Sequence, residues 1–311
     1  MITEFEDLCN ELWLDIFGYI EPRELYNTFW NLNSRLNNLL ASLTDLRLLI
    51  DGEKNEEIIA LLAPRIGCLQ VNTWNEIDLN GFDNLHSLIL TRPSVIQMKQ
   101  IRADTMPKLT YLSLFSNVYF TAPKQLIDDA FLNRFSSLQW ARLGRIDLSD
   151  SRYRFAQSHS LRYLHMSCSH TTMIPFILAS CPKLDYLHVD ILQNGDKTTI
   201  PPPPIIANHP LQKFILRDYC NFISYEDIRT LITYIPNTRK LELKFDCKVQ
   251  FISLSRYLSD SLSYLHRFDC DIIESPIDSS TSLTAIQQIH PCFCRIMCRA
   301  QVANFRIFAT Q

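Results

Sequence analysis

Apolar residues recur in short hexads along most of the chain, at the first, fourth and sixth positions of each hexad. The clear copies begin at Leu85, Leu109, Leu138, Leu161, Leu184, Leu211, Thr238 and Leu265, and a weaker copy begins at Ile66. Successive starts from Leu85 to Leu265 lie 23 to 29 residues apart. One hexad is weak evidence because leucine is common, but eight in register indicate an internal repeat.

This period is typical of leucine-rich repeats. In an extended strand the fourth and sixth residues point to one face, and the first packs just before the strand. One repeat cannot bury such a row, whereas stacked repeats form a parallel β-sheet with a continuous apolar core. The sequence therefore predicts an α/β fold: a curved solenoid with the parallel sheet on its concave face and helices on its convex face. The alternative is a general α/β domain that has leucine-rich strands.

The segments between the hexads carry helix and turn signals. Residues 125–132 and 225–232 are amphipathic and are expected to return the chain as helices. Pro107, Pro182 and Pro236 each stand two residues before a hexad, where proline is expected to end the preceding helix. The four prolines at 201–204 predict a surface loop of polyproline II conformation.

The first fifty residues have a helical period instead. Their regularly spaced apolar positions are Leu8, Leu12, Ile16, Phe17, Ile20, Leu25 and Phe29. Pro22 suits the first turn of a second helix, and Asn33 can cap a third. Three helices in so few residues make a small core, so this module is expected to pack on the repeats or on a partner.

Residues 4–45 resemble an F-box. The family begins with a leucine and has a hydrophobic pair, a following apolar residue, a turn and a second helix. The positions that match are Leu8, Ile16, Phe17, Ile20, Pro22 and Leu25, while Cys9 stands where the family usually has proline. With the repeats, the resemblance divides the chain into an F-box (1–48), a leucine-rich-repeat solenoid (49–271) and a C-terminal cap (272–311).

The resemblance implies a non-catalytic substrate receptor of a Skp–cullin–F-box ubiquitin ligase. In that family the F-box docks a Skp-type adaptor, which links it to a cullin, and the repeats hold the substrate protein. The adaptor-binding residues implied here are Leu8, Leu12, Ile16, Phe17, Ile20, Pro22, Leu25 and Phe29. The alternative is a leucine-rich-repeat scaffold whose F-box no longer reaches a ligase.

The third and fifth residues of each hexad, with Arg217 and Lys244 one step beyond their hexads, are expected to line the concave face and to bind the substrate. The candidates are Tyr111, Trp140, Arg142, Tyr163, His165, Tyr186, His188, Lys213, Arg217, Lys240 and Lys244. Neighbouring strands lie about 4.8 Å apart, so the aromatic members should form one ladder. Such residues dominate protein-binding surfaces, although they also serve to shield a sheet. The basic members suit an acidic or phosphorylated segment, or form a solvated charged surface.

Composition narrows the function classes. A net charge of −3 argues against nucleic acid as a partner, and the six glycines include no phosphate-binding loop. The acidic N-terminus and the absence of a long apolar run predict an intracellular protein, cytoplasmic or nuclear, with no membrane partner. No arrangement of residues indicates an enzyme or a cofactor.

The ten cysteines are scattered singly, and those at 68, 168, 220 and 247 lie in apolar segments typical of buried thiols. His290, Cys292, Cys294 and Cys298 raise the alternative of a zinc site. Their spacing lacks two separated Cys-x-x-Cys pairs, so no metal is expected there.

Overall fold

The structure is a computed structural model that describes residues 8–52, 56–73, 76–115, 120–146, 157–192, 208–277, 282–302 and 304–310. The proline run at 201–204 lies outside these residues. Within them, no helix has the length and apolar character required to cross a bilayer.

The chain divides into two compact units. One comprises Met1–Val118 with Pro123–Leu126, and the other comprises Tyr119–Ala122 with Ile127–Gln311. The boundaries expected at residues 48 and 271 mark changes in the sequence pattern, not in compactness, so they stay predictions.

The first unit opens with three helices and continues with parallel strands. Its elements are α1 (Asn10–Phe17), α2 (Pro22–Phe29), α3 (Ser34–Ser42), β1 (Leu46–Ile50), α4 (Glu56–Leu62), η2 (Ala63–Arg65), β2 (Ile66–Val71), β3 (Ser87–Thr91), α5 (Val95–Gln100) and β4 (Tyr111–Phe115). The strands pair in the order β1-β2-β3-β4, and every pair is parallel.

The second and third N-terminal helices begin where the sequence predicts. Pro22 is the first residue of α2, and the Asn33 side chain accepts a hydrogen bond from the Leu36 N–H at the start of α3. The core of the three-helix module is aromatic: the rings of Trp13, Phe17 and Phe29 lie 5.2 to 5.6 Å apart, centroid to centroid. Helix α2 also packs on β1 and α4, so the module shares its core with the strands that follow it.

The second unit alternates strands with helices. Helix α6 (Lys124–Phe131) is divided between the two units, with Ile127–Phe131 in the second. The elements that lie wholly in the second unit are β5 (Trp140–Arg145), β6 (Tyr163–Cys168), η4 (Thr171–Met173), α7 (Ile174–Ser180), β7 (Tyr186–Ile191), β8 (Lys213–Asp218), α8 (Tyr225–Tyr234), β9 (Lys240–Cys247), α9 (Phe251–Ser261), β10 (Arg267–Glu274), α10 (Leu283–Gln287), η5 (Pro291–Phe293), β11 (Ile296–Val302) and β12 (Phe305–Thr310). The strands pair in the order β5-β6-β7-β8-β9-β10-β12-β11. All neighbours from β5 to β10 are parallel.

Each hexad from Leu85 onward coincides with a strand that begins at its third residue. The fourth and sixth residues are buried throughout, as Leu164 and Met166 show on β6. Hydrogen-bonded register aligns equivalent hexad positions on neighbouring strands, for example Tyr163 with Tyr186 and Tyr186 with Lys213. The predicted alternation of the strands is confirmed.

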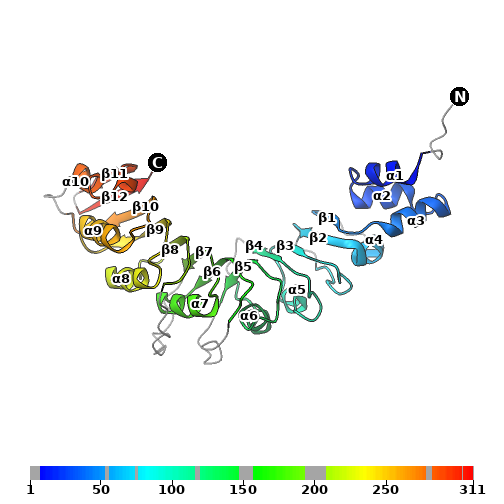
Figure 1. Ribbon diagram of the computed structural model, residues 1–311, viewed down its shortest axis with the longest axis horizontal. Coiled ribbons are helices and arrows are strands. Elements are labelled where there is room, and N and C mark those ends of the chain that lie inside the picture. The colour runs from blue at the N-terminus through cyan, green and yellow to red at the C-terminus, as the bar shows by residue number, and fades with distance from the viewer. Residues whose placement is uncertain are drawn as a thin grey trace. The chain divides into compact units, whose positions relative to one another are not determined.

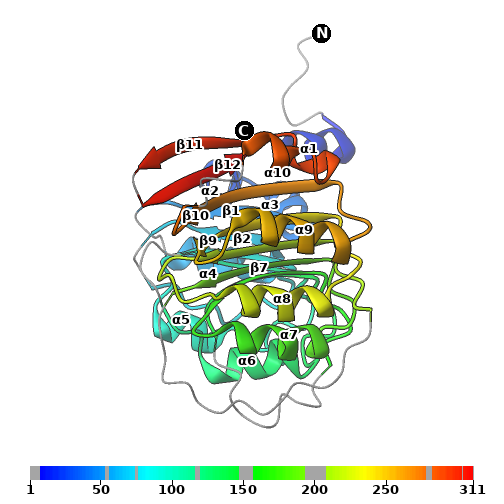
Figure 2. The ribbon, with the colours of Figure 1, turned by 90° about the vertical axis from the view of Figure 1, so that its left-hand side faces the viewer.

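Helices cover one face of these strands in the second unit. Figure 1 shows α7, α8 and α9 on the same side of the sheet, and Figure 2 shows them side by side in chain order. Helices α6 and α8 coincide with the two amphipathic segments of the sequence. Pro182 and Pro236 follow α7 and α8 within two residues, as predicted, whereas α5 ends at Gln100, well before Pro107. The α/β fold class with a mostly parallel sheet is confirmed.

The last forty residues depart from the parallel pattern. Strands β11 and β12 form an antiparallel pair, and β12 pairs antiparallel with β10. Arg306 Nε donates a hydrogen bond to Glu274 Oε2 at 2.7 Å, and Arg306 Nη2 lies 2.6 Å from the same oxygen. The other carboxylate oxygen of Glu274 accepts the Phe251 N–H at the start of α9, at 2.8 Å. This buried contact joins β12, β10 and α9.

Candidate functional site

The strands of the second unit carry a row of stacked rings on the face opposite the helices. The rings of Trp140 and Tyr163 lie 4.5 Å apart, and those of Tyr163 and Tyr186 lie 3.9 Å apart, each pair at 13°. The Lys213 ammonium group extends the row, 4.7 Å from the centroid of the Tyr186 ring. All four side chains are half-buried. We call Trp140, Tyr163, Tyr186 and Lys213 the ring row.

The sequence predicted this stacking because it places the three aromatic residues at the same hexad position. Burial, with a hydrogen bond to Tyr163, raises the pKa of the Tyr186 phenol above its ordinary value. Tyr186 therefore stays a neutral hydroxyl, able to donate or accept. Tyr111, the fourth aromatic residue predicted for the row, is half-buried on β4 of the other unit.

A second row of side chains lies two residues further along the same strands, and it includes two histidines. His165 and His188 are paired in register on β6 and β7, and their rings stack at 3.8 Å with an angle of 7°. Arg142 on β5 lies in register with His165, and Ile215 on β8 lies in register with His188. The imidazoles therefore lie between a cation and a buried apolar side chain.

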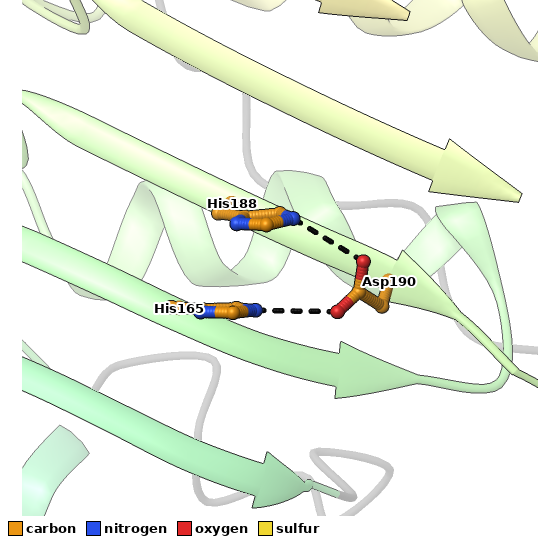
Figure 3. A group of neighbouring side chains, drawn as sticks. All are labelled: His165, His188 and Asp190. Carbon is orange, nitrogen blue, oxygen red and sulfur yellow. Dashed lines mark hydrogen bonds and ion pairs between the residues drawn. The ribbon is translucent and has the colours of Figure 1, made fainter. Parts of the chain in front are cut away.

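Asp190, two residues after His188, lies close to both histidines. His165 Nε2 lies 3.2 Å from Oδ2 of Asp190 in a hydrogen bond, and His188 Nε2 lies 3.2 Å from Oδ1. The second contact has ion-pair distance but lacks hydrogen-bond geometry. These three residues are the one group of potential metal ligands found among the described residues. Figure 3 shows both rings directing a nitrogen toward the carboxylate.

The protonation states of this group follow from burial and mutual contact. Burial lowers the pKa of His165, and the hydrogen bond to Asp190 only partly opposes that effect. Burial alone would raise the pKa of Asp190, but the two imidazoles outweigh it and hold that pKa well below its usual range. At neutral pH the group is a carboxylate beside a neutral His165 imidazole.

Two of the four basic residues predicted to bind an acidic segment, Arg217 and Lys244, form ion pairs with acids. Arg217 Nη2 lies 2.6 Å from Glu242 Oε1, and Lys244 Nζ lies 2.9 Å from Asp271 Oδ2. Lys240 is exposed. The acids lie on neighbouring strands of the same face, so this part of the face has mixed charge. That arrangement matches the alternative of a solvated charged surface.

The residues predicted to bind an adaptor fall into two groups. Phe17, Pro22, Leu25 and Phe29 are buried in the helical module. Leu12 is 49% exposed, while Leu8, Ile16 and Ile20 are half-buried. The period of four that includes Leu12 and Ile16 is therefore not the buried face of α1, because Trp13 and Phe17 fill the core instead.

The C-terminal cysteines do not gather into a group of three potential ligands within the described part of the chain. His290 Nδ1 accepts the Cys292 N–H at the start of η5 and lies 2.9 Å from the Cys292 thiol sulfur. Cys294 is exposed. Elsewhere Cys168 and Cys247 are buried, and burial raises the pKa of Cys168 to about 12, so that thiol is not ionised at neutral pH.

Sequence reasoning missed Asp190 because it carried the alternation to the seventh residue only in the repeats of Arg217 and Lys244. Extending the alternation by one step places Ser167, Asp190, Arg217, Lys244 and Asp271 on the same face. The spacing His188-x-Asp190 alone carries this signal, since residues two apart in a strand share a face.

Comparison with known proteins finds no matching family model and no matching curated protein sequence.

Proposed function

We propose that this chain is the substrate-recognition subunit of a Skp–cullin–F-box ubiquitin ligase. In this proposal helices α1, α2 and α3 are an F-box that docks a Skp-type adaptor. The strand–helix units are leucine-rich repeats of a curved solenoid, and their helix-opposed face holds the substrate protein.

The observation that carries the proposal is the apolar surface left on the helical module. Trp13, Phe17 and Phe29 fill its core, yet Leu12 is 49% exposed and Leu32 is 62% exposed. Tyr19, just after α1, is 93% exposed. Exposed apolar side chains on so small a module are typical of a protein-binding surface. Leu12 is also among the positions implied by the F-box resemblance.

The ring row supports the second half of the proposal. Its side chains are large, have polar tips and are held in fixed stacks, so little conformational entropy is lost when a partner covers them. The strands that carry these side chains are fixed in place by the apolar residues buried on the other face of the sheet. A rigid apolar strip with hydroxyl and amine groups at its edge suits a protein ligand.

The mechanism of such a receptor is proximity. The chain supplies no reacting group; it holds a lysine of the substrate near the ubiquitin-conjugating enzyme carried by the cullin. Tethering raises the effective concentration of the two reactants.

Binding of the full chain to a purified Skp-type adaptor tests the proposal. The expected result is a one-to-one complex by calorimetry, weakened at least tenfold in Leu12→Asp because a carboxylate would be buried against apolar surface. Val95→Asp is the matched control, since Val95 is 57% exposed on α5 of the same unit and lies outside the helical module.

If both substitutions weaken adaptor binding equally, the helical module is not the specific binding surface. A wild-type chain that fails to bind the adaptor would refute the ligase role and favour a scaffold that acts without a ligase.

A further inference from the structure

The group His165, His188 and Asp190 has the composition of a metal site. All of its candidate ligand atoms lie within 4.8 Å of one another. The two imidazoles and one carboxylate are donors that Zn²⁺ and similar divalent ions accept in proteins. The three side chains come from two adjacent strands, whose register fixes their spacing.

Two atoms of the group are buried without a hydrogen-bond partner. These are His188 Nε2 and Asp190 Oδ1, which face each other at 3.2 Å. The His188 side chain is only 8% exposed, so water does not readily satisfy its nitrogen. Leaving such atoms unpaired costs free energy, and a bound cation would satisfy both.

We propose that His165, His188 and Asp190 together bind one divalent transition-metal ion, with Zn²⁺ as the best match to the donor set. In a tetrahedral zinc site with bonds of about 2.0–2.1 Å, neighbouring ligand atoms lie about 3.3–3.4 Å apart. Both nitrogens already lie 3.2 Å from a carboxylate oxygen. The site goes beyond the receptor function and does not depend on it.

Binding requires a local adjustment of the rings. The two rings are nearly parallel at 3.8 Å, so their Nε2 atoms point in nearly the same direction and do not converge. Rotation about the Cβ–Cγ bond of either histidine, a torsion with a broad minimum, would turn the Nε2 of that ring toward an ion bound by the other.

The surroundings set the charge and the access of the site. A ligating nitrogen must be unprotonated, so the proton that His165 Nε2 donates to Asp190 moves to Nδ1 or to solvent when the ion binds. Arg142 on β5 and Arg217 on β8 flank the group, and the Arg217 charge is balanced by Glu242 at 2.6 Å. His165 and Asp190 side chains are 14% and 18% exposed, so water can complete the coordination.

Titration of the full chain, freed of metal by chelation, with Zn²⁺ tests the proposal. We expect one equivalent to bind by calorimetry and the apparent melting temperature to rise. Asp190→Asn, which keeps the shape of the side chain, and His165→Gln should each weaken binding at least tenfold. Circular dichroism of each variant without metal verifies that it folds.

Cys294→Ser is the matched control, because Cys294 is an exposed potential ligand far along the chain from the group. Co²⁺ adds a spectroscopic readout: the proposed site gives visible d–d bands without a thiolate charge-transfer band. The proposal is overturned if no Zn²⁺ binds, if Asp190→Asn binds as wild type, or if Cys294→Ser removes the bound ion.

Discussion

His209 illustrates how burial fixes the state of a single residue. It is 2% exposed, and both of its ring nitrogens have backbone partners. Nδ1 accepts the Leu211 N–H at 3.1 Å, so Nε2 carries the proton and donates it to the Cys181 carbonyl at 3.0 Å. Burial lowers the pKa of His209 below its ordinary value of 6.5, although those carbonyl contacts oppose the shift. Protonation of Nδ1 would break the contact with Leu211.

Stability should therefore fall in mild acid. Below pH 6.5 the unfolded chain takes up a proton at His209 that the folded chain does not, so unfolding becomes easier as the pH drops toward the folded pKa. His165, whose pKa burial also lowers, contributes in the same direction. Urea unfolding at pH 7.5 and 5.5 should show a smaller pH dependence for His209→Gln than for wild type.

His159→Gln is the control for that comparison, because His159 is exposed. An unchanged pH dependence in the His209 variant, or an equal change in the His159 variant, would contradict this account of the buried imidazole.

At the scale of elements, the sequence predicted the strands better than the ends of the sheet. The hexads located β3 to β10 because inward leucines at the fourth and sixth positions are required wherever strands stack. The helices are harder to place: α5 ends at Gln100 although Pro107 predicts a later end. Its Ser94–Gln97 capping box fixes the start, but the loop that follows has no repeated pattern.

The antiparallel pair β11 and β12 was not predicted, because its residues follow no hexad. What fixes β12 is a long-range contact, the buried Arg306–Glu274 pair, and two residues 32 apart give no local signal. Glu274 is fully buried and Arg306 is 7% exposed. The candidate site divides in the same way: the ring row follows from the repeat, whereas the contact of Asp190 with both histidines required the structure.

Breaking this buried pair should destabilise the C-terminal end of the sheet. Arg306→Met leaves the Glu274 carboxylate buried without a cation, which costs about 3–5 kcal/mol of unfolding free energy. The double change Glu274→Gln with Arg306→Met should recover most of the loss, because Gln keeps an acceptor for the Phe251 N–H without a charge. Urea unfolding measures both.

Arg299→Met provides the control, since Arg299 lies exposed on β11. If the double variant is as unstable as Arg306→Met alone, the loss comes from packing and not from the unpaired charge.

At the scale of the whole molecule, the proposed function assigns a separate task to each of two surfaces. The helical module exposes Leu12 and Leu32, and the second unit presents the ring row. Each surface lies within one compact unit, so each can be changed without altering the residues of the other. A receptor requires both surfaces on one chain, whereas a scaffold requires only the second.

Capture of the tagged full chain from cells with the proteasome blocked, followed by quantitative mass spectrometry, tests this claim most directly. Leu12→Asp should lose the Skp-type adaptor and cullin while it keeps the remaining partners. Trp140→Ala with Tyr163→Ala should keep adaptor and cullin while it loses those partners. Loss of both sets in either variant, or of neither set in both, would contradict the account.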